Sequence, residues 1–154
     1  MIWLPAEDGD THINIYTKGM TQLGRDLTNL APLGIVHPQY GSFSCIEAFW
    51  YWRKTGSKHD QLRTMTGFQC KKLGKTLEKV ECPTFNEDVL EAIRCKLRQH
   101  KGLRIALTAS TLPLAHYYFY GERNDNPKII MLPQYDWIVD EIERIRTVCK
   151  EHYK

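Results

Sequence analysis

The stretch from residue 43 to residue 54, FSCIEAFWYWRK, decides the fold, because it predicts a helix that carries reactive side chains. Ser44 stands before the apolar run and Glu47 follows it by three positions, which is the spacing of a capping box. We therefore expect a helix capped by Ser44 that runs to about Lys54 and is stopped by Gly56.

Two ionisable residues of this helix, Glu47 and Lys54, face the same way. Their seven-residue spacing is about two turns, so they lie about 10 Å apart along the axis and about 20° apart around it. A carboxyl group can exchange a proton with a sugar oxygen, and a lysine amine can attack an anomeric carbon and form a Schiff base. The alternative is structural: Glu47 caps the helix and Lys54 complements its dipole. Spacing alone favours the structural alternative.

Four aromatic residues separate these two side chains, namely Phe49, Trp50, Tyr51 and Trp52. They could form a dry wall or a platform on which a base stacks. Large aromatic side chains at helical spacing more often belong to the core, and the sequence favours that role.

The composition is that of an ordinary globular protein, with 42% hydrophobic and 25% charged residues, so residues 1–154 are expected to form one domain. A net charge of +3 permits a phosphate-bearing ligand without requiring one. The five cysteines form no CxxC pair, which argues against a disulfide framework or a zinc ribbon. The sequence contains no signal peptide and no long apolar run, which predicts a cytoplasmic protein with no membrane partner.

Periodicity along the chain predicts a helix-dominated α+β fold with a small β-sheet. Strands are expected at residues 12–17, 34–37, 114–120 and 128–132, the last two pairing with each other. Helices are expected at residues 44–54, in one or two pieces within 59–77, from 85 until Gly102 closes the helix, and from about 137 to 148; residues 103–109 fit a helix or a buried strand. Leu62, Met65, Phe68, Leu73 and Leu77 are expected to supply the apolar face of the 59–77 segment.

Several short matches in order along the chain give a resemblance. Residues 27–32, LTNLAP, are similar to an LSNFAP signature, and residues 44–54 follow with the glutamate and lysine of a segment like SVEHYFQAQKF. Residues 71–74, KKLG, and residues 103–108, LRIALT, continue the register. On these motifs the chain resembles the NADAR family of YbiA-like N-glycosidases and ADP-ribose-processing domains, as a divergent member, over about residues 14–146.

The resemblance implies a YbiA-like fold and an N-glycosidase that uses no metal and no other cofactor. Lys54 would be the covalent nucleophile and Glu47 the acid/base that assists ring opening. Asn29 would hold a ribose hydroxyl or a phosphate, although an asparagine is also a common turn residue. The other expected substrate-binding residues are Trp50, Arg53, His116, Tyr117, Tyr120 and Gly121.

The departures from the family pattern concern residues 112–121. Tyr120-Gly121 stands where the family has Trp-Gly, and Tyr117 occupies the place of its aspartate. His116 is the nearest titratable residue that could replace that aspartate, and Asp125 is a second candidate that equally suits a turn. Which residue makes up for the aspartate is left open.

Three functions follow, in order of preference. The first is removal of ADP-ribose from guanine in single-stranded DNA. The second is hydrolysis of a phosphorylated ribosylamino-pyrimidine of the riboflavin pathway, a small ribosyl nucleotide. The third is a non-catalytic module that binds ADP-ribose or NAD. A stand-alone bacterial or phage protein is expected, monomeric, and acting in the host cytoplasm if it is phage-encoded.

Overall fold

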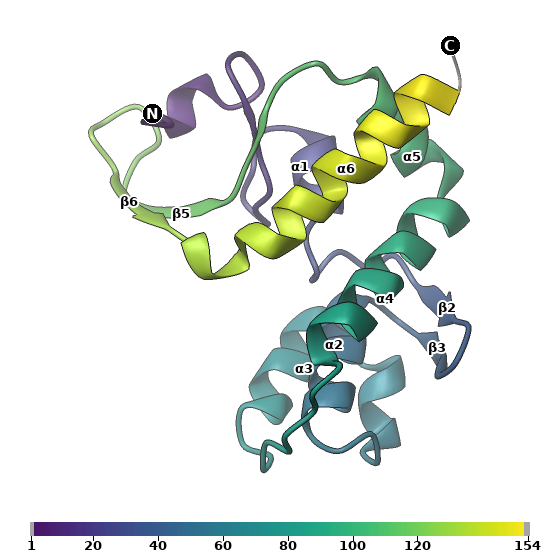
Figure 1. The fold of residues 1–154 in the computed structure, drawn as a ribbon. Coiled ribbons are helices and arrows are strands. Elements are labelled where there is room, and N and C mark those ends of the chain that lie inside the picture. Colours follow the sequence, from purple (N-terminus) through teal and green to yellow (C-terminus); the bar gives the residue numbers. More distant parts are fainter. Residues whose placement is uncertain (1, 153–154) are drawn as a thin grey trace. The chain divides into compact units, whose positions relative to one another are not determined.

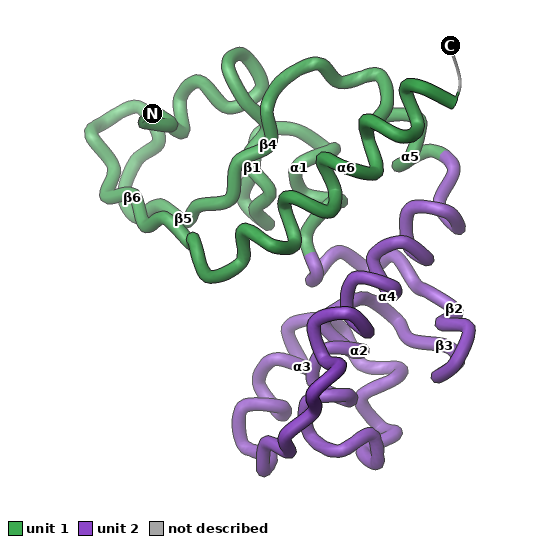
Figure 2. Tube along the Cα trace, in the orientation of Figure 1, with its two compact units in different colours: residues 1–28, 102–154 green, residues 29–101 purple. Residues whose placement is uncertain are grey.

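The computed structural model describes residues 2–152, and its helices and short strands confirm the predicted helix-dominated α+β class. The chain divides into two units (Figure 2): unit 1 comprises Met1–Thr28 and Gly102–Lys154, and unit 2 comprises Asn29–Lys101. That residues 1–154 form one domain stays a prediction. Within residues 2–152, no helix is both long and apolar enough to cross a membrane.

Unit 2 is built around one buried helix. Its elements are β2 (Ile35–His37), β3 (Gly41–Phe43), α2 (Ile46–Lys54), a 3₁₀ helix (Asp60–Thr64), α3 (Gly67–Gly74) and α4 (Phe85–Gln99). The strands β2 and β3 pair antiparallel, with Ile35 opposite Phe43. Helix α2 packs against α3, α4 and the 3₁₀ helix (Figure 1). The predicted helix end at Lys54 is confirmed, and Gly56 follows with a φ of +101° that favours glycine.

Helix α2 is apolar on almost every side, and this explains its central place. Its buried residues are Ile46, Ala48, Phe49, Trp50, Tyr51 and Trp52. The Phe49 ring stacks on His37 at 5.0 Å between centroids and meets the edge of Phe43 at 5.1 Å. The core role is therefore correct for the aromatic residues of α2.

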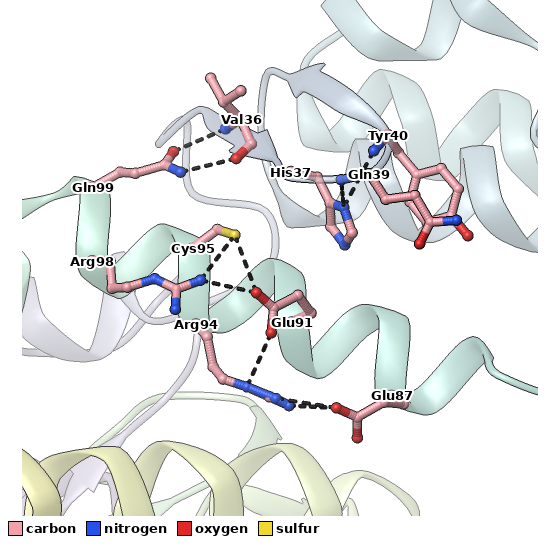
Figure 3. A network of polar contacts seen from close by, with 10 residues as sticks. All are labelled: Val36, His37, Gln39, Tyr40, Glu87, Glu91, Arg94, Cys95, Arg98 and Gln99. Atoms are coloured by element: carbon pink, nitrogen blue, oxygen red, sulfur yellow. Dashed lines mark hydrogen bonds and ion pairs between the residues drawn. The ribbon is translucent and has the colours of Figure 1, made fainter.

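Helix α4 closes unit 2 and holds β2 through a side chain (Figure 3). The Gln99 amide donates to the Val36 carbonyl oxygen at 2.9 Å and accepts from the Val36 amide at 2.8 Å. On the same helix, Arg94 pairs with Glu87 at 2.6 Å, and Arg98 pairs with Glu91 at 2.9 Å. Each pair joins residues seven positions apart on the surface of α4. Exposed ion pairs of this kind stabilise a helix only modestly.

Unit 1 is built from two segments of the chain, one before unit 2 and one after it. Its elements are β1 (Ile13–Asn14), α1 (Gln22–Asp26), β4 (Leu114–Ala115), β5 (Tyr117–Tyr120), β6 (Lys128–Met131) and α6 (Asp136–His152), with α5 (Lys101–Ala109) at the boundary and 3₁₀ helices at Pro5–Glu7 and Pro133–Tyr135. Strands β1 and β4 pair parallel, and β5 and β6 pair antiparallel, as predicted for β5 and β6. The predicted sheet is thus three two-stranded sheets, one of them in unit 2.

Four predictions of local structure were wrong. The 114–120 segment is two strands, because His116 interrupts it, and α1 lies where no helix was predicted. Gly102 lies inside α5 and closes no helix, since α4 already ends at Gln99. The expected apolar face of the 59–77 segment was wrong in part: Leu62 is buried as predicted, but Phe68 is 64% exposed, and α3 buries Gly67, Cys70 and Gly74.

Candidate functional site

The start of α2 differs from the predicted capping box. Its N-cap residue is Cys45, with no side-chain cap, so Glu47 is the second helical residue. The Ser44 hydroxyl instead donates a hydrogen bond to the Met65 carbonyl oxygen. The Glu47 amide donates to the Asn29 carbonyl oxygen at 2.9 Å, which places the LTNLAP segment against the start of α2. The cap is replaced by contacts with residues distant in the sequence.

The Glu47 carboxyl group is largely buried and receives no hydrogen bond or ion pair from any residue between 2 and 152. Burial raises its pKa to about 7, and the negative charge of a Cys45 thiolate acts in the same direction. The positive charges of Lys71 and Lys75 oppose this rise. Glu47 therefore exchanges its proton near neutral pH, which is where an acid/base catalyst works best.

Two buried thiols, of Cys45 and Cys70, lie beside Glu47 and were not predicted to matter. A hydrogen bond from the Cys70 thiol is the main cause that lowers the pKa of Cys45, and the Ala48 and Glu47 amides at the start of α2 add to it. Burial acts against that lowering. A cysteine at the start of a predicted helix was the signal in the sequence for this arrangement.

Lys54 lies at the other end of α2 and has aromatic neighbours. Its Nζ atom is 5.3 Å from the centre of the Trp50 ring and 5.3 Å from that of Phe85. Within residues 2–152, no carboxylate lies within ion-pair distance of Lys54. Neither Lys54 nor Glu47 therefore has an ion-pair partner among residues 2–152.

The other predicted residues of unit 2, Trp50, Arg53 and Asn29, differ in whether their side chains are free to contact a ligand. Trp50 is 9% exposed and its ring meets the edge of Phe85 at 4.8 Å, so it is part of the wall beside Lys54. Arg53 is occupied: its Nε donates to Asp88 at 2.9 Å and another nitrogen donates to Ser57 at 3.0 Å.

Asn29 is partly exposed, and its side-chain amide has no partner among residues 2–152. This availability suits the predicted contact with a ligand. Arg53, by contrast, could reach a ligand only by giving up Asp88.

Unit 1 contains the remaining predicted residues. The His116 Nδ1 atom lies 2.7 Å from the Ile15 carbonyl oxygen, so Nδ1 carries the proton and donates, which leaves Nε2 as the acceptor. Burial lowers the pKa of His116 and favours this neutral form. Tyr120 is 59% exposed, and Gly121 follows it in a turn with a φ of +96°.

Tyr117 is a core residue of unit 1. Its side chain is 0% exposed, and its hydroxyl lies 2.6 Å from His12 Nε2. Its backbone amide and carbonyl both bond to the Asn14 side chain at 3.1 Å. These contacts argue against a direct contact between Tyr117 and a substrate.

The predicted site residues thus fall into two groups (Figure 2). Asn29, Glu47, Trp50, Arg53 and Lys54 belong to unit 2, whereas His116, Tyr117, Tyr120 and Gly121 belong to unit 1. The group in unit 2 is organised by one helix, α2, and the loop bonded to its start. Within residues 2–152, no cluster of three or more His, Cys, Asp or Glu side chains could hold a metal ion.

The fold and the α2 group define an α+β protein with a lone carboxyl and a lone amine on one buried helix. No protein-family model and no curated protein sequence matches this chain. Among solved structures, the NMR structure of the E. coli protein YbiA is similar, with a TM-score of 0.66 and 18% identity over 93% of this chain and 87% of that chain. The YbiA-like fold predicted from the sequence motifs is therefore confirmed.

Proposed function

We propose that this protein is an N-glycosidase that hydrolyses the bond between ADP-ribose and a modified base, with ADP-ribosylated guanine in single-stranded DNA as the preferred substrate. One observation carries the proposal: helix α2 holds a part-buried, unpaired carboxyl group with a pKa of about 7 and, two turns along, an amine without a carboxylate partner. Core packing does not require either group, because apolar residues would fill those places at lower cost.

Glu47 supplies the proton that opens the sugar ring. It protonates the ring oxygen as the C1″–oxygen bond breaks, and the base nitrogen donates its electron pair to C1″. The Lys54 ammonium group gives a proton to water, its amine then adds to C1″, and the base leaves with that electron pair and a proton. This leaves an imine between C1″ and Lys54.

Water completes the reaction. It adds to the imine carbon, the C1″–nitrogen bond breaks, and free ADP-ribose leaves while Lys54 recovers its amine. Glu47, whose pKa lies near 7, can accept and return the protons that these steps move. The rings of Trp50 and Phe85 beside Lys54 limit the access of water to the amine.

Asn29 binds a ribose hydroxyl in this proposal, because its amide can both donate and accept and its backbone is bonded to Glu47. Arg53 acts as a support for α2, since Asp88 and Ser57 already occupy its guanidinium. The roles of His116, Tyr120 and Gly121 in substrate binding stay predictions for unit 1.

The test is release of free ADP-ribose from a single-stranded oligonucleotide that carries ADP-ribosylated guanine. Glu47→Gln should lower kcat by about 10²–10⁴-fold, as loss of a general acid does, and Lys54→Ala should lower it at least as much. Lys58→Ala is the matched control, because Lys58 is an exposed lysine four residues further along. Reduction with borohydride during turnover should attach ADP-ribose to wild type and not to the Lys54 variant.

Each other outcome has a meaning. Release that survives Lys54→Ala, or is lost equally in Lys58→Ala, contradicts the assigned nucleophile. Release from a phosphorylated ribosylamino-pyrimidine and not from the oligonucleotide moves the same chemistry to a small substrate. Binding of ADP-ribose without release from either substrate makes the chain a binding module.

A further inference from the structure

Helix α3 and its C-cap carry three lysines and no acidic residue, at Lys71, Lys72 and Lys75. The charge imbalance is wider than the helix, because residues 61–77 contain Arg63 and these lysines but no aspartate or glutamate. Among residues 2–152, none accepts a hydrogen bond from, or forms an ion pair with, the side chains of Lys71, Lys72 or Lys75. Three lysines without ion-pair partners within five residues concentrate positive charge, which suggests a role in binding an anion.

Two glycines fix how α3 packs in unit 2. A Cβ atom on Gly74 would lie 2.2 Å from Tyr51 of α2, and one on Gly67 would lie 2.9 Å from Leu30. The face of α3 that holds Gly67, Cys70 and Gly74 is therefore pressed against α2 and the loop before it. Only residues without a side chain allow so close an approach.

This packing places the three lysines at different angles from the packed face of α3. At about 100° per residue, Lys71 lies roughly 65° from the centre of the packed face, Lys75 roughly 105°, and Lys72 roughly 165°. Lys71 thus borders the packed face of α3, and Lys75 follows it one turn later on the same side. Lys72 lies on the far side of the helix.

The electrostatics of Glu47 agree with this placement. Lys71 and Lys75 are the two cations whose charges act on the Glu47 carboxyl group, and Lys72 is absent from them. The Asn29 carbonyl oxygen, bonded to the Glu47 amide, brings the loop that also contacts Gly67 to the same place. Asn29, Glu47, Lys71 and Lys75 therefore share one region of unit 2.

We propose that Lys71 and Lys75 form a phosphate subsite beside Glu47, so that the substrate is a ribosyl compound with a phosphate or diphosphate on its sugar. The inference rests on the proposed function for the identity of the sugar, but not for the binding of phosphate. Two ammonium groups one turn apart suit a group with several anionic oxygens better than they suit a single carboxylate. The flexible lysine stems let both amines follow the phosphate.

The competing explanation is that these lysines only stabilise the C-terminal end of α3, where positive charge is favourable. Lys72 would do that equally well, since it also lies in the last turn. Lys72 is therefore the control that separates binding from helix stabilisation.

The experiment measures binding by calorimetry at low ionic strength, with ADP-ribose, ribose 5-phosphate and ribose as probes. Wild type should bind the two phosphorylated probes and not ribose. The double variant Lys71→Gln/Lys75→Gln should bind ADP-ribose about ten-fold more weakly, as expected for the loss of two charge-assisted contacts. Lys72→Gln should bind it as wild type does. Lys71→Arg/Lys75→Arg should retain binding, and thermal melting should show all variants folded.

The result that overturns the subsite is equal binding of ADP-ribose by wild type and the Lys71/Lys75 glutamine variant, or an equal loss in Lys72→Gln. Comparison of the two phosphorylated probes tells a nucleotide diphosphate from a simple sugar phosphate. The calorimetric measurement does not depend on turnover, so binding that depends on Lys71 and Lys75 supports the subsite even where no glycosidic bond is cleaved. Cleavage with a KM unchanged in the double variant would uphold the proposed function and refute the subsite.

Discussion

In unit 1 the buried carboxylate of Asp8 accepts hydrogen bonds from the Asn14 amide at 3.0 Å and the Met20 amide at 2.9 Å. In unit 2 the carboxyl group of Glu47 is part-buried, and no residue among those described bonds to it. The Asp8 carboxylate holds a loop in place, whereas the Glu47 carboxyl group makes no stabilising contact and lowers the stability of the fold when it is ionised. A buried polar group without a partner is costly, so it is a good indicator of function.

The largest expected effect removes the organising carboxylate. Asp8→Ala leaves one buried and one part-buried amide without their charged acceptor, which should lower the free energy of unfolding by about 3–5 kcal/mol. Urea denaturation measures it, and Asp10→Ala, on an exposed neighbour, is the control. A loss below that of an ordinary surface change would mean that the amides find other partners.

Glu47→Gln should change stability in the opposite direction, and only at higher pH. The folded pKa of about 7 lies above the ordinary value of 4.5, so the ionised form is disfavoured in the folded state, and stability is lost as the pH rises from about 4.5 to about 7. At pH 8 the variant should therefore be more stable than wild type by about 3 kcal/mol, with little difference at pH 4. Denaturation at both pH values measures this, and a variant less stable than wild type at pH 8 would show that Glu47 has a structural role.

A third change tests the close packing of α3 on α2. Gly74→Ala places a Cβ atom against the Tyr51 ring, which should cost about 1–3 kcal/mol. Gly102→Ala is a matched control in a helix of unit 1, because a Cβ atom there meets nothing within 4 Å. That control should be neutral or stabilising by up to about 1 kcal/mol, as helix propensity predicts. Thermal melting of both variants checks the contrast, which fails if they change alike.

The smallest effect concerns the hydrogen bond inside unit 1. Tyr117→Phe removes the hydroxyl that lies 2.6 Å from His12 Nε2 and should cost about 1 kcal/mol of stability. It should leave the proposed glycosidase activity near that of wild type, since Tyr117 is fully buried. A large loss of activity without a loss of stability would return Tyr117 to the substrate-binding residues.

The sequence predicted elements better than it predicted their contacts. Two segments, Ser44 to Glu47 and Thr66 to Gln69, carry spacing suited to a capping box, and only the second forms one. Ser44 loses its capping role because its hydroxyl reaches the Met65 carbonyl oxygen, 21 residues away. Local pattern cannot report a partner that only the folded chain brings near.

For the candidate site, too, the sequence predicted which residues belong to it but not their contacts. Motif order led to Glu47 and Lys54, and helical period placed them on one side of α2, but neither indicated that both lack partners. The aromatic residues between them were correctly weighed as core. The unequal surroundings of Lys71 and Lys72 depend on glycine contacts with Tyr51 and Leu30, which no spacing rule contains.

The discontinuity of unit 1 has a consequence for synthesis. Asn14 and its partner Tyr117 are 103 residues apart, and all of unit 2 lies between them. At roughly 5–20 residues per second, a ribosome delivers that partner about 5–20 s after the first strand has emerged. During that interval the β1 strand of the nascent chain has an unpaired edge. By the time Tyr117 is synthesised, all of unit 2 has been synthesised, including α2 with Glu47 and Lys54.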